Sequence, residues 1–441
     1  MLHRRQCEIV ENRFEHVADI SKAEAMAVDE LGKELAAPAS SWSEESDDEE
    51  LERESDPDNE EGQRKPSVIR VHQRPSDTGW RIQVDRAIGV IGVNDLQINV
   101  VPKIPQAHFN YLAEIAIAPQ RMRFGRDSFK LQPDSSFLPS VWGAYLDALS
   151  ITLRADLHHE YEERADDPPY IRGRLDVRKT SINLSRGLLR FPSVFEDLTV
   201  NNPVNRLLKA AAETVGYAAE LAAPNGPSPQ HDAYRNLVTR AREMAYRMAD
   251  VGKLRPGDHD AAEPRLAVHQ SDALQLARHI LTGVGRSLTL GDVKVTCFLM
   301  PTPDLIERGV RTILDDKLAP EITVSKKPKV AARLRFQPDL VFEVAGDPPL
   351  HPRATGDVKY RIRKHDWARS TLLQVMGFAQ VFASPLSVFV DFSTAGEVPL
   401  ESEIINDITY HHVSWPCSED TTPEEAERQV LSDVRRALSS N

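Results

Sequence analysis

The residues best suited to chemistry lie close together in the last third of this 441-residue chain. Asp339 follows a proline at the start of one run typical of a β-strand. Asp357 and Lys359 lie in a second such run, residues 354–362. Because side chains alternate between the two faces of a strand, Asp357 and Lys359 point the same way. If the two runs pair as a hairpin, Asp339 faces the same place. The pattern therefore predicts a site with two carboxylates and one amine.

Carboxylate oxygens and water are the ligands that Mg²⁺ prefers, and one or two protein carboxylates are enough to hold it. A lysine beside the ion can position or deprotonate an attacking water. The spacing, PD followed by (D/E)xK, resembles that of the restriction-endonuclease-like nuclease superfamily, which implies Mg²⁺-dependent cleavage of DNA. The pattern is degenerate, so the alternative is that these three residues are solvated charges on the edge of a hairpin.

The elements around these residues are predicted in the order that this superfamily uses. A strand over residues 293–300 and a helix over residues 304–314 precede the hairpin, and a helix over residues 367–382 and a strand over residues 386–392 follow it. Glu307 on the first helix is a candidate third acid for the metal. Gln374 on the second is a candidate for holding DNA or the site lysine. Each is equally well explained as a satisfied surface polar group.

Composition sets limits on the rest of the chain. Hydrophobic residues make up 41% and charged residues 27%, which is typical of globular proteins of two or three domains. Three widely separated cysteines favour a reducing cytoplasm, and neither a secretory signal nor an 18-residue apolar run is present. Residues 41–63 contribute −11 of the net charge of −13, so we expect this tract to be disordered. The remainder is nearly neutral, and any DNA contact must come from local basic patches or from a partner.

Apolar spacing and turn signals predict further elements along the chain. The N-terminal residues 9–20 are weakly helical, and residues 171–178 are strand-like and carry Arg172, Arg174 and Arg178. Asn202 is expected to cap a helix that starts with Pro203 in its first turn. Short strands are predicted at residues 68–71, 80–84, 88–93 and 96–101, and helices at residues 109–118, 139–159, 204–221, 234–248, 272–281 and 422–438.

Four stretches carry a more specific resemblance. The sequence resembles the McrC family, the partner subunits of the McrB GTPase in modified-cytosine-dependent restriction. Three features depart from the family: the acidic tract, the long loop at residues 345–355 between the two acidic motifs, and Phe378 where the family tends to have tyrosine four residues after the glutamine. The matching stretches are residues 89–104 (GVIGVNDLQINVVPKI), 170–180 (YIRGRLDVRKT) and 195–211 (FEDLTVNNPVNRLLKAA), with a core that contains Glu307, Asp339, Asp357 and Lys359.

The resemblance implies a nuclease subunit that works with a separate AAA+ GTPase ring. The chain has no GxxxxGK[ST] motif, so it should not hydrolyse nucleotides itself. The β-rich N-terminal part would insert in or cap the McrB-like ring and stimulate GTP hydrolysis. Such stimulation often uses a basic group aimed at the nucleotide. Arg172, Arg174 and Arg178 are candidates, although they could instead pair with nearby acids (Glu162, Glu163 and Asp176).

The fold class expected is α/β of the α+β kind, with a β-rich and helical N-terminal domain followed by a restriction-endonuclease-like mixed-sheet nuclease domain. The expected boundaries are 1–67 for an N-terminal segment with the acidic tract, 68–220 for the partner-binding domain, 221–262 for a helical linker and 263–441 for the nuclease domain. Two alternatives stay open. One is a non-catalytic activator of the GTPase with a degenerate nuclease fold, and the other is a scaffold with a surface hairpin.

Overall fold

The computed structural model describes residues 5–17, 20–35, 68–73, 79–117, 136–224, 226–261, 265–326, 336–344, 352–362, 369–394 and 400–439. The acidic tract, most of the 345–355 loop and the first residues of the helix predicted at 367–382 lie outside these ranges. The chain divides into two compact units. Unit 1 comprises residues 1–141, 221–231 and 282–441, and unit 2 comprises residues 142–220 and 232–281. In the described part of the chain, no helix combines the length and hydropathy needed to cross a membrane.

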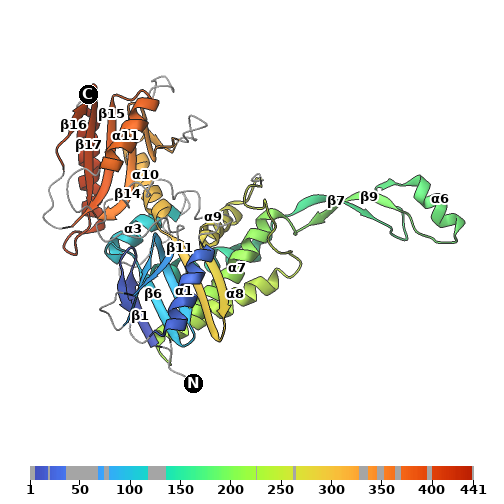
Figure 1. Cartoon of the computed structure of the whole chain (residues 1–441). Coiled ribbons are helices and arrows are strands. Elements are labelled where there is room, and N and C mark those ends of the chain that lie inside the picture. The colour runs from blue at the N-terminus through green and yellow to red at the C-terminus, as the bar shows by residue number, and fades with distance from the viewer. Residues whose placement is uncertain are drawn as a thin grey trace. The chain divides into compact units, whose positions relative to one another are not determined.

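A five-stranded sheet forms the first layer of unit 1, in the order β1-β6-β5-β11-β10. Its strands are β1 (Arg5–Val10), β5 (Ala87–Val93), β6 (Leu96–Val101), β10 (Val284–Leu290) and β11 (Val293–Pro301). The yellow β10 and β11 complete a sheet that is otherwise blue in Figure 1, so segments about 200 residues apart in sequence pair directly. Gly89 of β5 makes this pairing possible, because a Cβ there would lie 2.0 Å from the carbonyl oxygen of Phe298.

Smaller elements cover this sheet. Strands β2 (Glu15–Val17), β4 (Trp80–Val84) and β3 (Ile69–His72) form a second, three-stranded sheet. Helix α1 (Lys22–Leu35) packs against β3, β10 and β11, and its buried Val28 and Leu31 join the common apolar core. The predicted helix at residues 9–20 is wrong. The apolar spacing there comes from two short strands, and β1 gains its backbone hydrogen bonds by parallel pairing with β6.

A six-stranded mixed sheet forms the other layer of unit 1, in the order β12-β13-β14-β15-β17-β16. The strands are β12 (Ile322–Ser325), β13 (Leu340–Val344), β14 (Ala354–Ile362), β15 (Leu386–Ser393), β16 (Glu403–Ile405) and β17 (Ile408–Pro416). β14, β15 and β17 are parallel, and the outer pairs are antiparallel. Helices α3 (Gln106–Ile117), α10 (Pro303–Leu318), α11 (Arg369–Val381) and α12 (Pro423–Ser439) accompany this sheet.

A buried polar network ties the two layers of unit 1 together. Glu11, which directly follows β1, is fully buried and accepts hydrogen bonds from Thr302 Oγ1 at 2.8 Å and from the backbone N–H of Lys103 at 3.2 Å. Thr302 precedes helix α10, and the ammonium group of Lys103 lies 4.1 Å from the ring centre of Tyr360 on β14. The network therefore anchors the start of α10 and a residue of β14 to the first sheet.

Unit 2 is built on helices, with a β-arm that extends from them (Figure 1, green). The helices are α5 (Phe137–Ala155), most of which lies in this unit, α7 (Pro203–Ala222), which runs just past its edge, α8 (Pro229–Arg247) and α9 (Val268–Thr282). The arm contains β7 (Glu160–Asp166), β9 (Ser193–Thr199), the short β8 (Arg174–Leu175) and the helix α6 (Val177–Ser185). We call residues 160–199 the arm. The predicted strand at residues 171–178 is largely wrong, because Asp176 caps α6 by accepting from the Lys179 N–H, and only two residues pair.

The base of the arm is fixed by an asparagine-rich turn. Asn202 Oδ1 accepts from the Asn205 N–H at 3.0 Å, which confirms the predicted cap of α7. The side-chain amides of both asparagines donate to the carbonyl of His158, just before β7. Arg206 then makes a two-point contact with Asp258, at 2.9 and 2.7 Å, and both side chains are about 5% exposed. The motif at residues 201–206 therefore holds the start and end of the arm on α7.

Candidate active site

The two acids predicted to converge do meet on the six-stranded sheet. β13 and β14 pair as the predicted hairpin, with Leu340 opposite Gly356. Asp339 and Asp357 are the next residues on the two strands, at the same end of this pairing. Both are buried, at 8% and 2% exposed. The backbone N–H of Val358 donates to Asp339 Oδ2 at 3.3 Å, and Lys359 Nζ lies 3.4 Å from Asp357 Oδ2. Asp339, Asp357 and Lys359 are therefore brought together.

Asp357 has an unusual electrostatic environment. Its pKa is raised to about 7, mainly by burial; the ammonium group of Lys359 opposes this rise and the neighbouring carboxyl of Asp339 adds to it. Despite the ion pair with Lys359, Oδ2 of Asp357 accepts no hydrogen bond from any described residue. A buried carboxylate oxygen without a donor is energetically unfavourable, so this atom is suited to a further ligand.

Sequence reasoning missed the second lysine of the site. Lys326 Nζ lies 3.2 Å from Asp339 Oδ1, 3.8 Å from Glu307 Oε2 and 3.9 Å from Asp304 Oδ1. No motif identifies it, because it belongs to a plain Ser-Lys-Lys-Pro run. Only strand pairing identifies Lys326 as part of the site. Ser325, the last residue of β12, pairs with Val341 and so brings Lys326 next to the start of β13.

The remaining predicted residues lie on helices beside the sheet. Glu307 projects from α10 and shares the Lys326 ammonium group with Asp339, so it belongs to the same cluster. Gln374 is half-buried on α11, which packs against β14 and β15. Its proposed contact with DNA or the site lysine stays a prediction. Phe378, where the resemblance led us to expect a tyrosine, is buried edge-to-face against Phe336.

Two observations support a divalent metal at this cluster. Asp357 Oδ2 is an unsatisfied buried acceptor, and Asp339, Glu307 and Asp304 already surround one cation, the Lys326 ammonium. No three metal-binding side chains within the described ranges are close enough together to form a complete metal site as they stand. Mg²⁺ needs only one or two protein carboxylates and keeps its remaining waters, so Asp339 and Asp357, with Glu307 nearby, fit such an ion.

The buried Asp357 carboxyl predicts a pH dependence of the metal-free protein. Its pKa in the folded state, about 7, lies above the ordinary value of 3.8, so its contribution to stability is fully present below that ordinary value and lost as the pH rises through 7. We compare the free energy of unfolding in urea, with a chelator present, for Asp357→Asn and the wild type. We expect the value for Asp357→Asn minus the value for the wild type to rise by on the order of 2 kcal/mol between pH 5 and pH 8. A difference that is independent of pH would contradict the raised pKa.

The three arginines proposed to stimulate GTP hydrolysis do not form one row. Arg172 donates to Asp197 at 2.8 Å and lies over the ring of Phe195, 4.0 Å from its centre, so it is held against β9. Its partner is not one of the three acids that the sequence suggested. Arg174 on β8 and Arg178 on α6 are exposed. All three belong to the arm, and their role towards a nucleotide stays a prediction.

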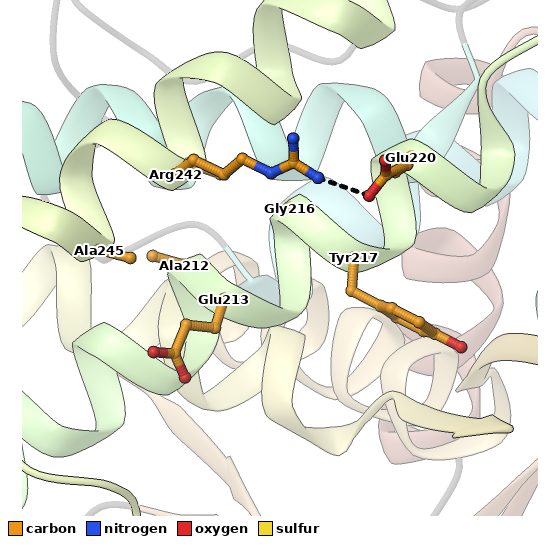
Figure 2. A pocket seen from close by; sticks show the side chains of 8 residues that line it. Ala212, Glu213, Gly216, Tyr217, Glu220, Arg242 and Ala245 are labelled. Atoms are coloured by element: carbon orange, nitrogen blue, oxygen red, sulfur yellow. Dashed lines mark hydrogen bonds and ion pairs between the residues drawn. The ribbon is translucent and has the colours of Figure 1, made fainter.

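A shallow groove between α7 and α8 is a separate feature of unit 2. Figure 2 shows its small residues and the ion pair between Arg242 and Glu220, at 2.7 Å, that closes one side. Its volume is about 250 Å³. Its lining is mainly alanine, glycine and surface charges, without a buried titratable group, so we assign it no chemistry.

The fold and the acid–lysine cluster define an α+β protein with a nuclease-like mixed sheet. Residues 82–386 match the model of the McrBC 5-methylcytosine restriction system component, and the chain belongs to this family. The comparison with curated proteins gives no match.

Two solved structures are similar to the chain. One is a refined half-complex from a tetradecameric assembly of Thermococcus gammatolerans McrB AAA+ hexamers with bound McrC. The match has 15% identity and a TM-score of 0.51, and it covers 98% of this chain and 99% of that chain. The other is the cryo-EM structure of the Thermococcus gammatolerans McrBC complex, with 16% identity, a TM-score of 0.39, and coverage of 71% of this chain and 88% of that chain. The first likeness supports a shared fold along the whole chain.

Proposed function

We propose that this chain is the Mg²⁺-dependent endonuclease subunit of a modified-cytosine-dependent restriction system. The observation that carries the proposal is the buried pair Asp339 and Asp357, with an unsatisfied carboxylate oxygen and Lys359 beside it. Asp339 and Asp357 would hold Mg²⁺, with Glu307 assisting. The bound ion would supply positive charge to the scissile phosphate.

The chain's own residues would carry out the rest of the reaction. Lys359, held by Asp357 on the same face of β14, would orient the attacking water and stabilise the charge that develops on the phosphate. The low exposure of both acids keeps bulk water away and so strengthens these electrostatic contacts. The Val358 N–H fixes the Asp339 carboxylate in place through Oδ2.

The partner would be an McrB-like AAA+ GTPase, because this family and the similar assembly pair the two proteins. The arm supports such docking. It exposes apolar side chains that a lone protein would bury, including Tyr161, Tyr170, Ile171, Val177, Leu189 and Leu198. The proposed activity belongs in the cytoplasm, where DNA and GTP are both present. The test is a reconstitution with an McrB-like GTPase, which should give Mg²⁺- and GTP-dependent cleavage of methylated DNA.

If the arm docks on the GTPase, substitutions in the arm should weaken partner binding selectively. Replacing Ile171 and Leu189 with serine should weaken binding to the GTPase about tenfold or more and abolish the stimulation of GTP turnover, because both side chains are exposed apolar anchors. Sedimentation and a GTPase assay measure the two effects. Ile404→Ser is a matched control, since Ile404 in unit 1 is 72% exposed, as Leu189 is. Equal stimulation by the arm variant and the control would exclude the arm as the docking surface.

The second candidate is a non-catalytic activator of the GTPase. The observation that favours it is Phe378, which packs in the apolar interior and leaves α11 without the expected hydroxyl at that position. GTPase stimulation without DNA cleavage in the same reconstitution would favour this activator function.

A further inference from the structure

A lysine of the protein itself supplies positive charge to the carboxylate of Asp339. Lys326 Nζ lies among the carboxylates of Asp339, Glu307 and Asp304, at 3.2, 3.8 and 3.9 Å. The ammonium group neutralises part of an acidic cluster that would otherwise repel itself.

We propose that Lys326 is an internal counter-ion of the acidic cluster. Before a divalent ion binds, the Lys326 ammonium group holds Asp339 and Glu307 together, and the divalent ion then displaces this ammonium group. This inference rests on the proposed function, because it assigns the same carboxylates to the metal. Lys326 would compete with the metal for these carboxylates. It would therefore set the affinity of the site for the metal, and so the metal concentration at which the site fills.

The two lysines of the site are held differently, which is why only one is displaced. Lys359 is fixed on β14 two residues from Asp357, so the period of the strand keeps the two side chains together. Lys326 comes directly after β12 ends, and its ammonium group reaches the cluster only through its flexible stem. Its side chain is 27% exposed, so the ammonium group can move into water without crossing the protein interior.

A second observation shows that the cluster has room for a ligand that Lys326 does not provide. Asp357 Oδ2 is buried and accepts no hydrogen bond from a described residue, although the Lys359 ammonium group lies 3.4 Å away, whereas Lys326 is paired with Asp339 through Oδ1. The two ammonium groups together therefore leave Asp357 Oδ2 without a hydrogen bond. A divalent ion carries twice the charge, so it can satisfy both aspartates at once and outcompete the lysine.

The test measures metal binding rather than cleavage. The full-length chain, without a partner, is titrated with Mn²⁺ in a calorimeter, as wild type and as Lys326→Met. We expect the variant to bind Mn²⁺ at least tenfold more tightly, because a competing unit charge about 3 Å from Asp339 is gone. We also expect a lower melting temperature without metal, restored by saturating Mn²⁺. Lys294→Met, which removes an exposed lysine of β11 in the same unit, should bind Mn²⁺ as the wild type does.

The outcomes separate this inference from the proposed function. Equal or weaker Mn²⁺ binding by Lys326→Met, with binding lost in Asp357→Asn, would overturn only the counter-ion role. Mn²⁺ binding that Asp357→Asn leaves intact, or no binding by any form, would overturn both the metal site of the proposed function and the counter-ion. Lys326→Gln is measured in parallel, so that a folding defect of the methionine variant cannot decide the result.

Discussion

Replacing Asp357 with asparagine is expected to reduce Mg²⁺-dependent DNA cleavage by about a hundredfold or more, in the assembly with the GTPase partner. The substitution keeps the shape of the side chain but removes the charge that the metal needs, and it frees Lys359 from the ion pair that orients it. Binding to the GTPase and the stimulation of GTP turnover should be unchanged. The measurement is a plasmid-cleavage time course, with GTP turnover followed in the same reaction.

Asp407→Asn is the control for this prediction. Asp407 lies in the exposed turn between β16 and β17 with a φ of 62°, a conformation that asparagine also adopts readily, so the charge change is the same and the fold is retained. Cleavage at the wild-type rate by Asp357→Asn would remove the acid–lysine cluster from the mechanism. The residues that cleave DNA would then lie elsewhere in the assembly.

Removing the partner of a buried arginine should produce the largest change in stability. Asp258→Ala leaves the guanidinium group of Arg206 buried without its carboxylate, which costs about 3–5 kcal/mol in proteins. Arg206 lowers the pKa of Asp258, so the pair contributes fully above the ordinary carboxyl pKa and its contribution is lost as the pH falls below that value. Urea unfolding at pH 7, followed by circular dichroism, measures the change in the free energy of unfolding.

Two further variants show whether the loss comes from the unpaired charge. Asp250→Ala removes an exposed acid of the same unit and should change the free energy of unfolding by less than about 0.5 kcal/mol. The double variant Arg206→Met with Asp258→Leu removes both charges and should recover most of the stability, although the contact of Arg206 with the Asn201 carbonyl is also lost. A loss below about 1 kcal/mol in Asp258→Ala would show that water reaches the guanidinium group.

Local pattern predicted three strands of the six-stranded sheet, β13, β14 and β15, but not β12, β16 or β17. The hairpin that carries Asp339 and Asp357, the helices that carry Glu307 and Gln374, and the strand after them all form close to their expected bounds. These elements are set by interactions close in sequence, namely the apolar period and the turn residues. The convergence of Asp357 and Lys359 follows from the two-residue period of a single strand.

The pairing of strands that lie far apart in the sequence could not be predicted from local pattern. The strand predicted at residues 293–300 forms as β11, but it belongs to the five-stranded sheet, beside β5, rather than to the nuclease-like sheet. The N-terminal β1 and β2 were missed for the same reason, since a short strand is stabilised by its partner and not by its own sequence. The 171–178 run became a turn and a helix start because Asp176 caps it locally.

By itself, then, the sequence determined the family, the elements that carry the proposed site and the three residues at its centre, because motifs and periodicity depend on neighbours along the chain. Only the tertiary structure decided that Lys326 joins those residues, that Asp357 is buried with an unsatisfied oxygen, and that Arg206 and Asp258 fix the base of the arm. Burial and charge proximity depend on segments far apart in sequence, and it is these that set the electrostatics of the site.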